Sequence, residues 1–228
     1  MIKKASKNKL SSGKISKLMA KTNFYPVWGT IYIPEINIIK GDITKQKVDA
    51  IVNSANEYLI VGGGVDGAIH LAAGDALEEE CKSIGRCEIS EAVITKGYNL
   101  PAKHVIHTVS PRYKNGEKIE NVIHLLRNCY KNTLRLALKN NIESIAFPAI
   151  GTGIFQIPYD KACKVALSSI KEIVCDPSEF HFFKKINFIV RTDENYETYV
   201  NKLKEFFKQD DKDLTPGFHT FIPEKHQI

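Results

Sequence analysis

The sequence predicts an α/β fold in which a mostly parallel sheet is covered by helices on both faces. Two observations carry this prediction. Short apolar, β-branched runs alternate along the chain with segments whose apolar residues recur every three to four positions. The short runs lack polar alternation, which is typical of strands that are buried on both faces. Strands that alternate with helices favour a three-layer α/β/α arrangement with parallel strand pairs.

The strand and helix patterns can be placed along the chain. Six segments fit buried strands: 37–42 (NIIKGD), 50–56 (AIVNSAN), 92–97 (AVITKG), 104–109 (HVIHTV), 144–149 (SIAFPA) and 185–191 (KINFIVR). Helical spacing covers 65–77, 122–137, 162–170 and 196–207. Asn140–Asn141 suits a left-handed end of the second helix, and Pro158 suits the start of the third.

Length and charge divide the chain into three parts. Its 228 residues, 43% of them apolar, suit one globular domain, and no apolar run reaches the ~20 residues of a membrane span. Residues 1–34 hold seven lysines and no acid, whereas 35–228 hold 25 basic and 26 acidic residues. We therefore expect a basic N-terminal arm and edge segment (1–34), a near-neutral domain (35–207) and a C-terminal tail (208–228).

The basic arm is open to three interpretations. It is a solvated arm, a targeting segment or a nucleic-acid contact. An intracellular location, cytoplasmic or nuclear, is expected, and the acid-free arm leaves a mitochondrial address open although it has no arginine. A near-neutral domain argues against nucleic acid as a partner, because phosphate binding needs clustered lysine and arginine. We expect a monomer with no membrane partner.

The cysteine and histidine pattern does not predict a metal centre. The five cysteines are Cys81, Cys87, Cys129, Cys163 and Cys175, and none forms a CxxC pair. We interpret them as reduced thiols in or near the core. His104 and His107 lie three apart in a strand pattern, so they point to opposite faces and make a poor pair of ligands.

Two glycine loops follow predicted strands and precede predicted helices. Loop one contains Gly62, Gly63 and Gly64; loop two contains Gly151, Thr152 and Gly153. Backbone N–H groups at such places point at anions, and two loops of this kind can hold one diphosphate between them. Neither loop is a Walker A loop, since no Gly-Lys-Ser/Thr follows, and neither spells GxGxxG with a following acid.

Five motifs in one collinear order resemble a known family. They are GDIT (41–44), VDAIVNSAN (48–56), GGGVDGAIHLAAG (62–74), GYNLPAKHVIHTV (97–109) and PAIGTGIFQIP (148–158). Together they resemble the macrodomain, and within it the MacroD-type branch that hydrolyses mono-ADP-ribose from proteins. The resemblance implies a mixed, mostly parallel sheet and spans about 35–207.

The resemblance also implies a set of site residues. Asp42 would accept from the adenine amino group and Ile43 would line the adenine pocket. Asn56 would contact the distal ribose, and Asp66 would orient or activate water, so these two are the candidate catalytic residues. The remaining implied ADP-ribose contacts are Gly62, Gly63, Gly64, Val65, Gly151, Thr152, Gly153, Ile154 and Phe155.

The sequence departs from the family pattern at four places. Val61 stands where the family often has a fourth glycine, and Gly151 replaces a common serine. Gln156 and Ile157 replace a common glycine and aromatic residue, which puts the distal-ribose wall and the substrate range in question. Nothing resembles the paired glutamates of the poly(ADP-ribose) glycohydrolase branch.

Several candidate residues also have purely structural interpretations. Asp66 could cap its helix, Asp42 could form a turn, and Phe155 could anchor its loop. We expect a structural role for Asn53 and a buried, satisfied ring for His70.

Three functions compete at this stage. The first is a hydrolase that removes mono-ADP-ribose from acidic side chains and deacetylates O-acetyl-ADP-ribose, with no cofactor and no metal. The second is a reader that binds ADP-ribose without cleaving it, and the third is a nucleic-acid module.

Overall fold

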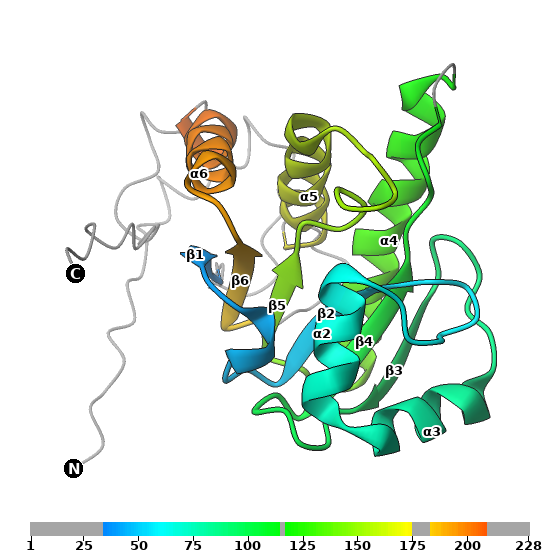
Figure 1. The fold of residues 1–228 in the computed structure, drawn as a ribbon. Helices are drawn as coiled ribbons and strands as arrows, with labels where there is room; N and C mark the ends of the chain where they lie inside the picture. The colour runs from blue at the N-terminus through cyan, green and yellow to red at the C-terminus, as the bar shows by residue number, and fades with distance from the viewer. Residues whose placement is uncertain (1–33, 115–116, 175–182, 209–228) are drawn as a thin grey trace, which may run out of the picture.

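The computed structural model describes residues 34–114, 117–174 and 183–208 (Figure 1). Most of the predicted arm and tail, together with Cys175, lie outside these residues. The described chain contains six strands: β1 (Glu35–Lys40), β2 (Ala50–Ala55), β3 (Ala92–Lys96), β4 (His104–Val109), β5 (Ser144–Pro148) and β6 (Lys185–Val190). Its helices are the short 3-10 helix η1 (Ile43–Lys45) and α2 (Gly64–Ala73), α3 (Asp75–Ile84), α4 (Ile119–Lys139), α5 (Tyr159–Val174) and α6 (Asp193–Lys208).

The strands form one mixed sheet in the order β1-β6-β5-β2-β4-β3. Every neighbouring pair is parallel except β3 and β4, which are antiparallel at one edge. Each predicted strand therefore exists, within two residues of its expected bounds. The edge strand β1 pairs with β6, from the far end of the described chain.

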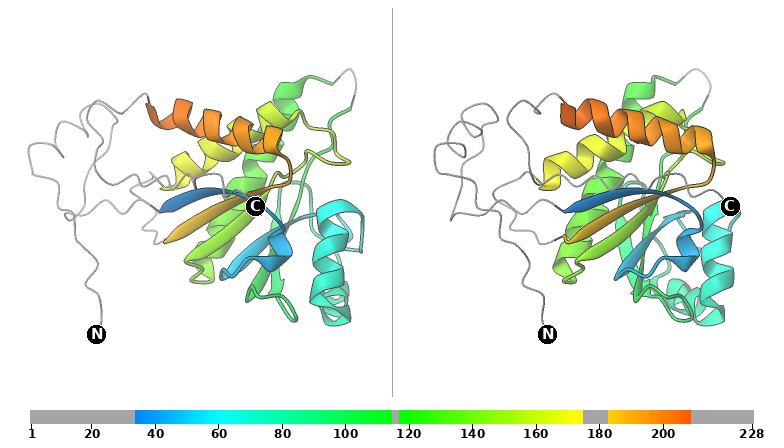
Figure 2. Two further views of the ribbon diagram at one scale, coloured as in Figure 1. Left: turned by 60° about the vertical axis from the view of Figure 1, so that its left-hand side comes forward. Right: turned by 90° about the vertical axis from the view of Figure 1, so that its left-hand side faces the viewer.

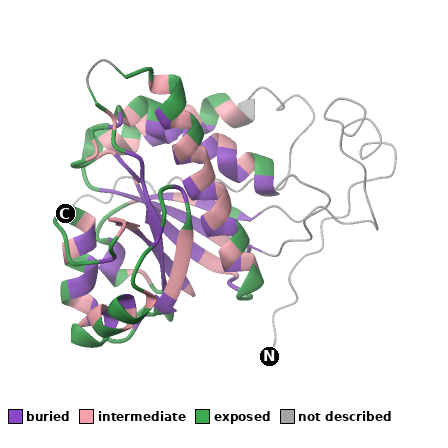
Figure 3. Ribbon diagram, turned by 90° about the vertical axis from the view of Figure 1, so that its right-hand side faces the viewer, coloured by how far each residue is buried: buried purple, intermediate pink, exposed green. Residues whose placement is uncertain are grey.

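Helices cover both faces of the sheet, which confirms the predicted three-layer arrangement (Figure 2). One core cluster lies between the sheet and α4, α5 and α6, and it contains Tyr130, Phe147 and Tyr199. The second lies between the sheet and α2 and α3, and it contains Ile51, Ile69 and Leu77. Figure 3 shows the buried strands between the two helical layers. None of the described helices is both long and apolar enough to span a membrane.

The predicted helix over 65–77 is wrong as a single element. The chain forms two helices instead, α2 and α3, which meet at Gly74. Gly74 has φ +85°, a conformation that favours glycine and interrupts the helix. The apolar spacing continues across the break because both helices bury residues against the same face of the sheet. The predicted end of α4 is confirmed, since Asn141 has φ +56°.

The parallel strands bring the predicted site loops to one edge of the sheet. The carboxyl ends of β1, β5 and β2 lead into Asp42, loop two and loop one, respectively. Neighbouring strands lie about 4.8 Å apart, so the three strand steps from β1 to β2 span roughly 14 Å. This edge is where parallel sheets bind ligands, and its width suits an extended ligand rather than a single small anion.

Candidate functional site

Loop two offers free backbone donors at the end of β5. The N–H groups of Thr152, Gln156 and Ile157 bond to carbonyls of Ala149, Gly153 and Gly151. Among the described residues, no hydrogen bond uses the N–H groups of Gly153, Ile154 or Phe155. A row of unpaired N–H groups before the start of α5 is an anion-binding arrangement. The predicted diphosphate residues of loop two therefore lie where a phosphate could accept from them.

Gly151 has little space for a side chain. Its φ is +77°, and a Cβ there would lie 2.5 Å from Ser110 Oγ and 2.6 Å from Ile157 Cδ1. Ile157 is buried, so the glycine at 151 and the isoleucine at 157 fit together. Gln156, at a position where the family often has glycine, has φ +60°. A left-handed conformation is costly for glutamine, so this departure carries backbone strain.

The distal end of loop two is tied to the segment after β4. The Phe155 carbonyl accepts a hydrogen bond from Tyr113 N at 2.8 Å. The Arg112 guanidinium lies over the Phe155 ring, 5.6 Å from its centroid, as a cation–π contact. Phe155 is half-buried. Its ring is therefore held at the site edge by an exposed arginine that no motif indicated.

Loop one and the start of α2 enclose the Asp66 carboxylate. Asp66 is only 5% exposed. Its Oδ2 accepts from Gly62 N at 2.6 Å, and its Oδ1 accepts from Asn53 Nδ2 at 2.6 Å. The N–H groups of Gly63, Gly64 and Val65 have no partner among the described residues. Loop one therefore has a buried carboxyl group beneath it and free N–H donors on the chain above it.

Asp66 does not act as a simple helix cap. The N-cap of α2 is Gly63, which makes no side-chain cap bond. Asp66 lies in the first turn and reaches back to Gly62, one residue before that cap. Its carboxylate holds loop one and the amide of Asn53 instead of the first helical N–H groups. This contact pattern goes beyond the capping interpretation of an acidic first-turn residue.

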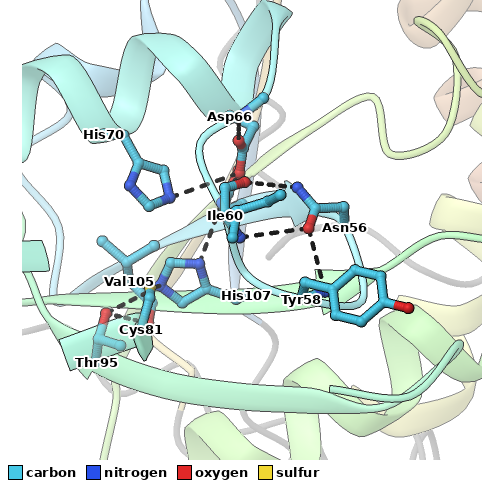
Figure 4. A network of polar contacts seen from close by, with 11 residues as sticks. Asn56, Tyr58, Ile60, Asp66, His70, Cys81, Thr95, Val105 and His107 are labelled. Atoms are coloured by element: carbon cyan, nitrogen blue, oxygen red, sulfur yellow. Dashed lines mark hydrogen bonds and ion pairs between the residues drawn. The ribbon is translucent and has the colours of Figure 1, made fainter. Parts of the chain in front are cut away.

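Asn56 lies beside Asp66 but uses its amide within loop one (Figure 4). Its Nδ2 donates to Ile60 O at 2.6 Å, and its Oδ1 accepts from Tyr58 N and Ile60 N. A Cβ placed on Gly62 would lie 3.1 Å from Asp66 Oδ2 and 3.7 Å from Asn56 Nδ2. The two candidate catalytic side chains thus flank one glycine, and Asn56 also shapes the loop.

The adenine-side candidates lie after β1. Asp42 is exposed and caps η1, since its Oδ1 accepts from Thr44 N and Thr44 Oγ1. The Thr44 N–H lowers the pKa of the Asp42 carboxyl, so the group stays ionised and Oδ2 can accept from a ligand. Ile43 is buried in the core beneath α2. Both interpretations of Asp42, as a turn residue and as a ligand acceptor, fit this geometry.

Sequence reasoning missed a buried polar cluster behind Asp66. The Asn53 amide also lies 3.1 Å from His107 Nδ1, and His107 Nε2 lies 3.0 Å from Thr95 Oγ1. His70 Nε2 lies 3.8 Å from Asp66 Oδ1, and neither ring nitrogen of His70 has a hydrogen-bond partner among the described residues. The structural role predicted for Asn53 stays a prediction, and the structure adds that its amide contacts the candidate catalytic carboxylate. The prediction that the His70 ring is satisfied is wrong.

Part of this cluster has the composition of a metal site. His70, Cys81 and His107 are buried, and their ligand atoms lie within 4.8 Å of one another. Two imidazoles and a thiol suit zinc. However, Asn53 Nδ2 can only donate to His107 Nδ1, so the ring proton is on Nε2, facing Thr95 and Cys81. Burial also raises the pKa of the Cys81 thiol to about 11. We interpret His107 as part of the hydrogen-bonded network, with His70 and Cys81 packed against it.

The cysteines agree with the prediction of reduced thiols. Cys81, Cys87, Cys129 and Cys163 are buried and free. Burial raises the pKa of Cys87 to about 11 and of Cys163 to about 12. Buried thiols of this kind are poor nucleophiles. These four cysteines are therefore packing residues.

Sequence comparison with known proteins finds relatives of this chain. The Macro domain family profile matches residues 52–166. Human "ADP-ribose glycohydrolase MACROD2" is 46% identical over 180 residues, which cover 78% of this chain and 41% of that protein. The chain thus spans less than half the length of that relative. A macro domain-containing protein of Methanosarcina mazei is 54% identical over 142 residues, 62% of this chain and 75% of that protein.

Solved macrodomain structures share this fold, and two of them hold ADP or ADP-ribose. The Oceanobacillus iheyensis macrodomain with ADP has a TM-score of 0.70 and 35% identity, covering 75% of this chain and 91% of that one. The Trypanosoma brucei macrodomain in complex with ADP-ribose has a TM-score of 0.67 and 37% identity, covering 74% and 69%. The sheet order, the two glycine loops and these similarities lead to one conclusion: the chain belongs to the macrodomain family, and its sequence is of the MacroD type.

Proposed function

We propose that this protein binds ADP-ribose at the carboxyl edge of its sheet and hydrolyses the ester that joins mono-ADP-ribose to acidic side chains of proteins. The observation that carries the proposal is the buried Asp66 carboxylate, held beneath loop one beside the free donors of both loops. The name of the human relative, an ADP-ribose glycohydrolase, supports the same reaction class.

In the proposed complex, both glycine loops contact the ligand. The diphosphate accepts from the N–H groups of Gly153, Ile154 and Phe155 in loop two and from those of loop one. The adenine lies toward Asp42, roughly 14 Å from β2, and the distal ribose lies between Asp66 and Phe155. The diphosphate therefore does not need to share one small site with the Asp66 carboxylate.

The chemical step needs a base near the scissile ester. Each oxygen of the Asp66 carboxylate accepts one hydrogen bond in the structure and keeps a further lone pair. In the proposed step Asp66 orients a water and takes its proton as the water attacks the ester. The bond between the distal ribose and the carboxyl group breaks, and the products are ADP-ribose and the free acid. The acetyl ester of O-acetyl-ADP-ribose would be cleaved in the same way.

A reader without catalysis is the second candidate, and one observation favours it. The Asn56 amide is occupied by Tyr58 and Ile60 of its own loop. A residue that only shapes loop one would serve a binding module as well as an enzyme. The two candidates differ in turnover and not in affinity for ADP-ribose.

The deciding experiment follows release of labelled ADP-ribose from a glutamate-linked, mono-ADP-ribosylated protein. We expect release by the wild-type chain, and a rate lower by on the order of 10²–10⁴ for Asp66→Ala, the usual worth of a positioned general base. Asp75→Ala is the matched control, since Asp75 is an exposed first-turn acid of α3. Tight binding of ADP-ribose by calorimetry without any release would favour the reader instead.

A further inference from the structure

The network behind Asp66 crosses three neighbouring strands. Asn53 in β2 and His107 in β4 are direct partners in the parallel register. Thr95 in β3 pairs with Val105, so it is the diagonal neighbour of His107 on the same face. This face is covered by α2 and α3, which bring Asp66, His70 and Cys81 over it. The register of the sheet therefore aligns Thr95, His107 and Asn53, one on each strand, in a row that ends at Asp66.

The direction of each hydrogen bond in the row follows from Asp66. An ionised carboxylate only accepts, so the Asn53 amide must present its NH₂ group to Asp66 Oδ1. The same NH₂ lies 3.1 Å from His107 Nδ1, which must therefore accept. His107 then carries its proton on Nε2 and donates to Thr95 Oγ1 at 3.0 Å, while the Thr95 hydroxyl points to Val105 O at 3.4 Å.

His107 is a neutral acceptor throughout the working pH range. The ring is fully buried, and burial lowers its pKa to about 3, with the His70 ring as a second cause. The groups that face it are Asn53 on β2, Thr95 on β3, His70 on α2 and the thiol of Cys81 on α3. The single ring proton therefore lies on Nε2, where the Thr95 hydroxyl accepts it.

We infer that His107 and Thr95 are positioning residues for the hydrolysis proposed above, because they fix the Asn53 amide in the orientation that holds Asp66. The inference rests on that proposed function. It adds residues from β3 and β4 that touch neither the glycine loops nor the ligand edge.

Removal of the Thr95 hydroxyl leaves the His107 Nε2 proton facing only the Cys81 sulfur at 3.9 Å, which is a weak acceptor. The proton can then move to Nδ1, where it faces the NH₂ of Asn53. The amide relieves this contact by turning its oxygen to His107, and the same oxygen then faces Asp66 Oδ1. A carboxylate next to an amide oxygen loses its donor and moves from the position that the structure shows.

The test compares Thr95→Val with Thr108→Val. Thr108 is a buried threonine on β4 whose hydroxyl bonds to Glu91 O, outside the network. We expect Thr95→Val to lower kcat on the order of tenfold, the rate equivalent of one lost hydrogen bond, with KM within about twofold. Thr108→Val should keep wild-type kcat, and Thr95→Ser should restore it. Full kcat in folded Thr95→Val, or equal losses in both valine variants, would overturn the inference.

A second measurement separates this inference from the proposed function. Nitrogen NMR of the His107 ring reports which nitrogen carries the proton, with no need for substrate. We expect the Nε2–H form in wild type and in Thr108→Val, and a shift to Nδ1–H in Thr95→Val. A wild-type protein that shows the Nε2–H form but hydrolyses nothing would refute the proposed function alone. The Nδ1–H form in wild type would refute the network itself.

Discussion

Asp66 Oδ1 accepts a hydrogen bond from Asn53 Nδ2 at 2.6 Å, so the end of β2 and the first turn of α2 are joined through a buried carboxylate. The other carboxylate oxygen accepts from Gly62 N. Each carboxylate oxygen therefore accepts from one donor. Removal of the charge would leave that donor buried without its partner or would displace it. The proposed catalysis and the loop geometry therefore involve the same side chain. Turnover and stability must both be measured for each substitution of Asp66.

Asp66→Asn is expected to lower hydrolysis on the order of 10²–10⁴. Asparagine has only one acceptor oxygen, so its NH₂ group must face either Gly62 N or the Asn53 amide. We therefore also expect a loss of about 1–3 kcal/mol in the free energy of unfolding. Denaturation curves and single-turnover kinetics on the same preparation separate the two effects. A stable variant with full turnover would leave Asp66 as a structural residue.

Gly153→Glu is expected to abolish ADP-ribose binding in a folded protein. A Cβ at Gly153 meets no atom within 4 Å, so the substitution should not disturb the fold. A glutamate there would cover the free N–H groups of loop two and repel the diphosphate. Calorimetry with ADP-ribose measures the loss, and Gly153→Ala, which adds no charge, is the control. Near wild-type affinity for the glutamate variant would place the diphosphate elsewhere.

Asp42→Ala is expected to weaken ADP-ribose binding by about 1.5–3 kcal/mol, the scale of a hydrogen bond to a charged group. Ribose 5-phosphate, which has no adenine, should lose much less affinity. Because Asp42 also caps η1 through Thr44, Asp42→Asn is the better-matched variant, since asparagine retains an oxygen that can cap. Equal losses for both ligands would contradict an adenine contact at this residue.

Gly67→Ala is expected to displace loop one. The Cβ would lie 2.5 Å from the Gly62 carbonyl oxygen, which is a backbone atom and cannot rotate away. We expect a loss in stability of about 1–3 kcal/mol, as for other overpacked sites, together with weaker hydrolysis. Ala68→Gly, at an exposed position of the same helix, is a control for helix propensity. Unchanged stability and turnover in Gly67→Ala would show that the loop has room to move.

The pH dependence of stability should report His107. Burial lowers its folded pKa to about 3 against 6.5 in the unfolded chain, so the unfolded state binds the extra proton as pH falls. Stability should then be full above about pH 6.5 and decrease by up to about 1.4 kcal/mol per pH unit below it. Between pH 6.5 and 4 this slope should be smaller in His107→Gln. A slope equal to that of wild type would contradict a buried neutral ring.

Much of the fold could be predicted because buried parallel strands have a distinctive sequence pattern. The β-branched runs predicted all six strands, and the two glycine loops indicated the edge of the sheet where a ligand would bind. The break at Gly74 was not predictable from apolar spacing, since α2 and α3 bury the same face. Asn53, His107 and Thr95 lie far apart in sequence, and only the strand order and register bring them together. The individual ligand contacts were implied only by the resemblance to the macrodomain family, and they remain predictions.

The pairing of β1 with β6 has a consequence for how the protein is made. β1 is an edge strand whose one partner in the described sheet is β6, and β6 ends at Val190. The ribosome synthesises the chain from the N-terminus, so Asp42 leaves the ribosome about 150 residues before the end of β6. β6 is the strand that holds the segment leading to Asp42 in place. The loops after β2 and β5 can gather earlier, as β2 pairs with β5 directly. During synthesis the nascent chain would therefore form the proposed diphosphate site first and the proposed adenine site last.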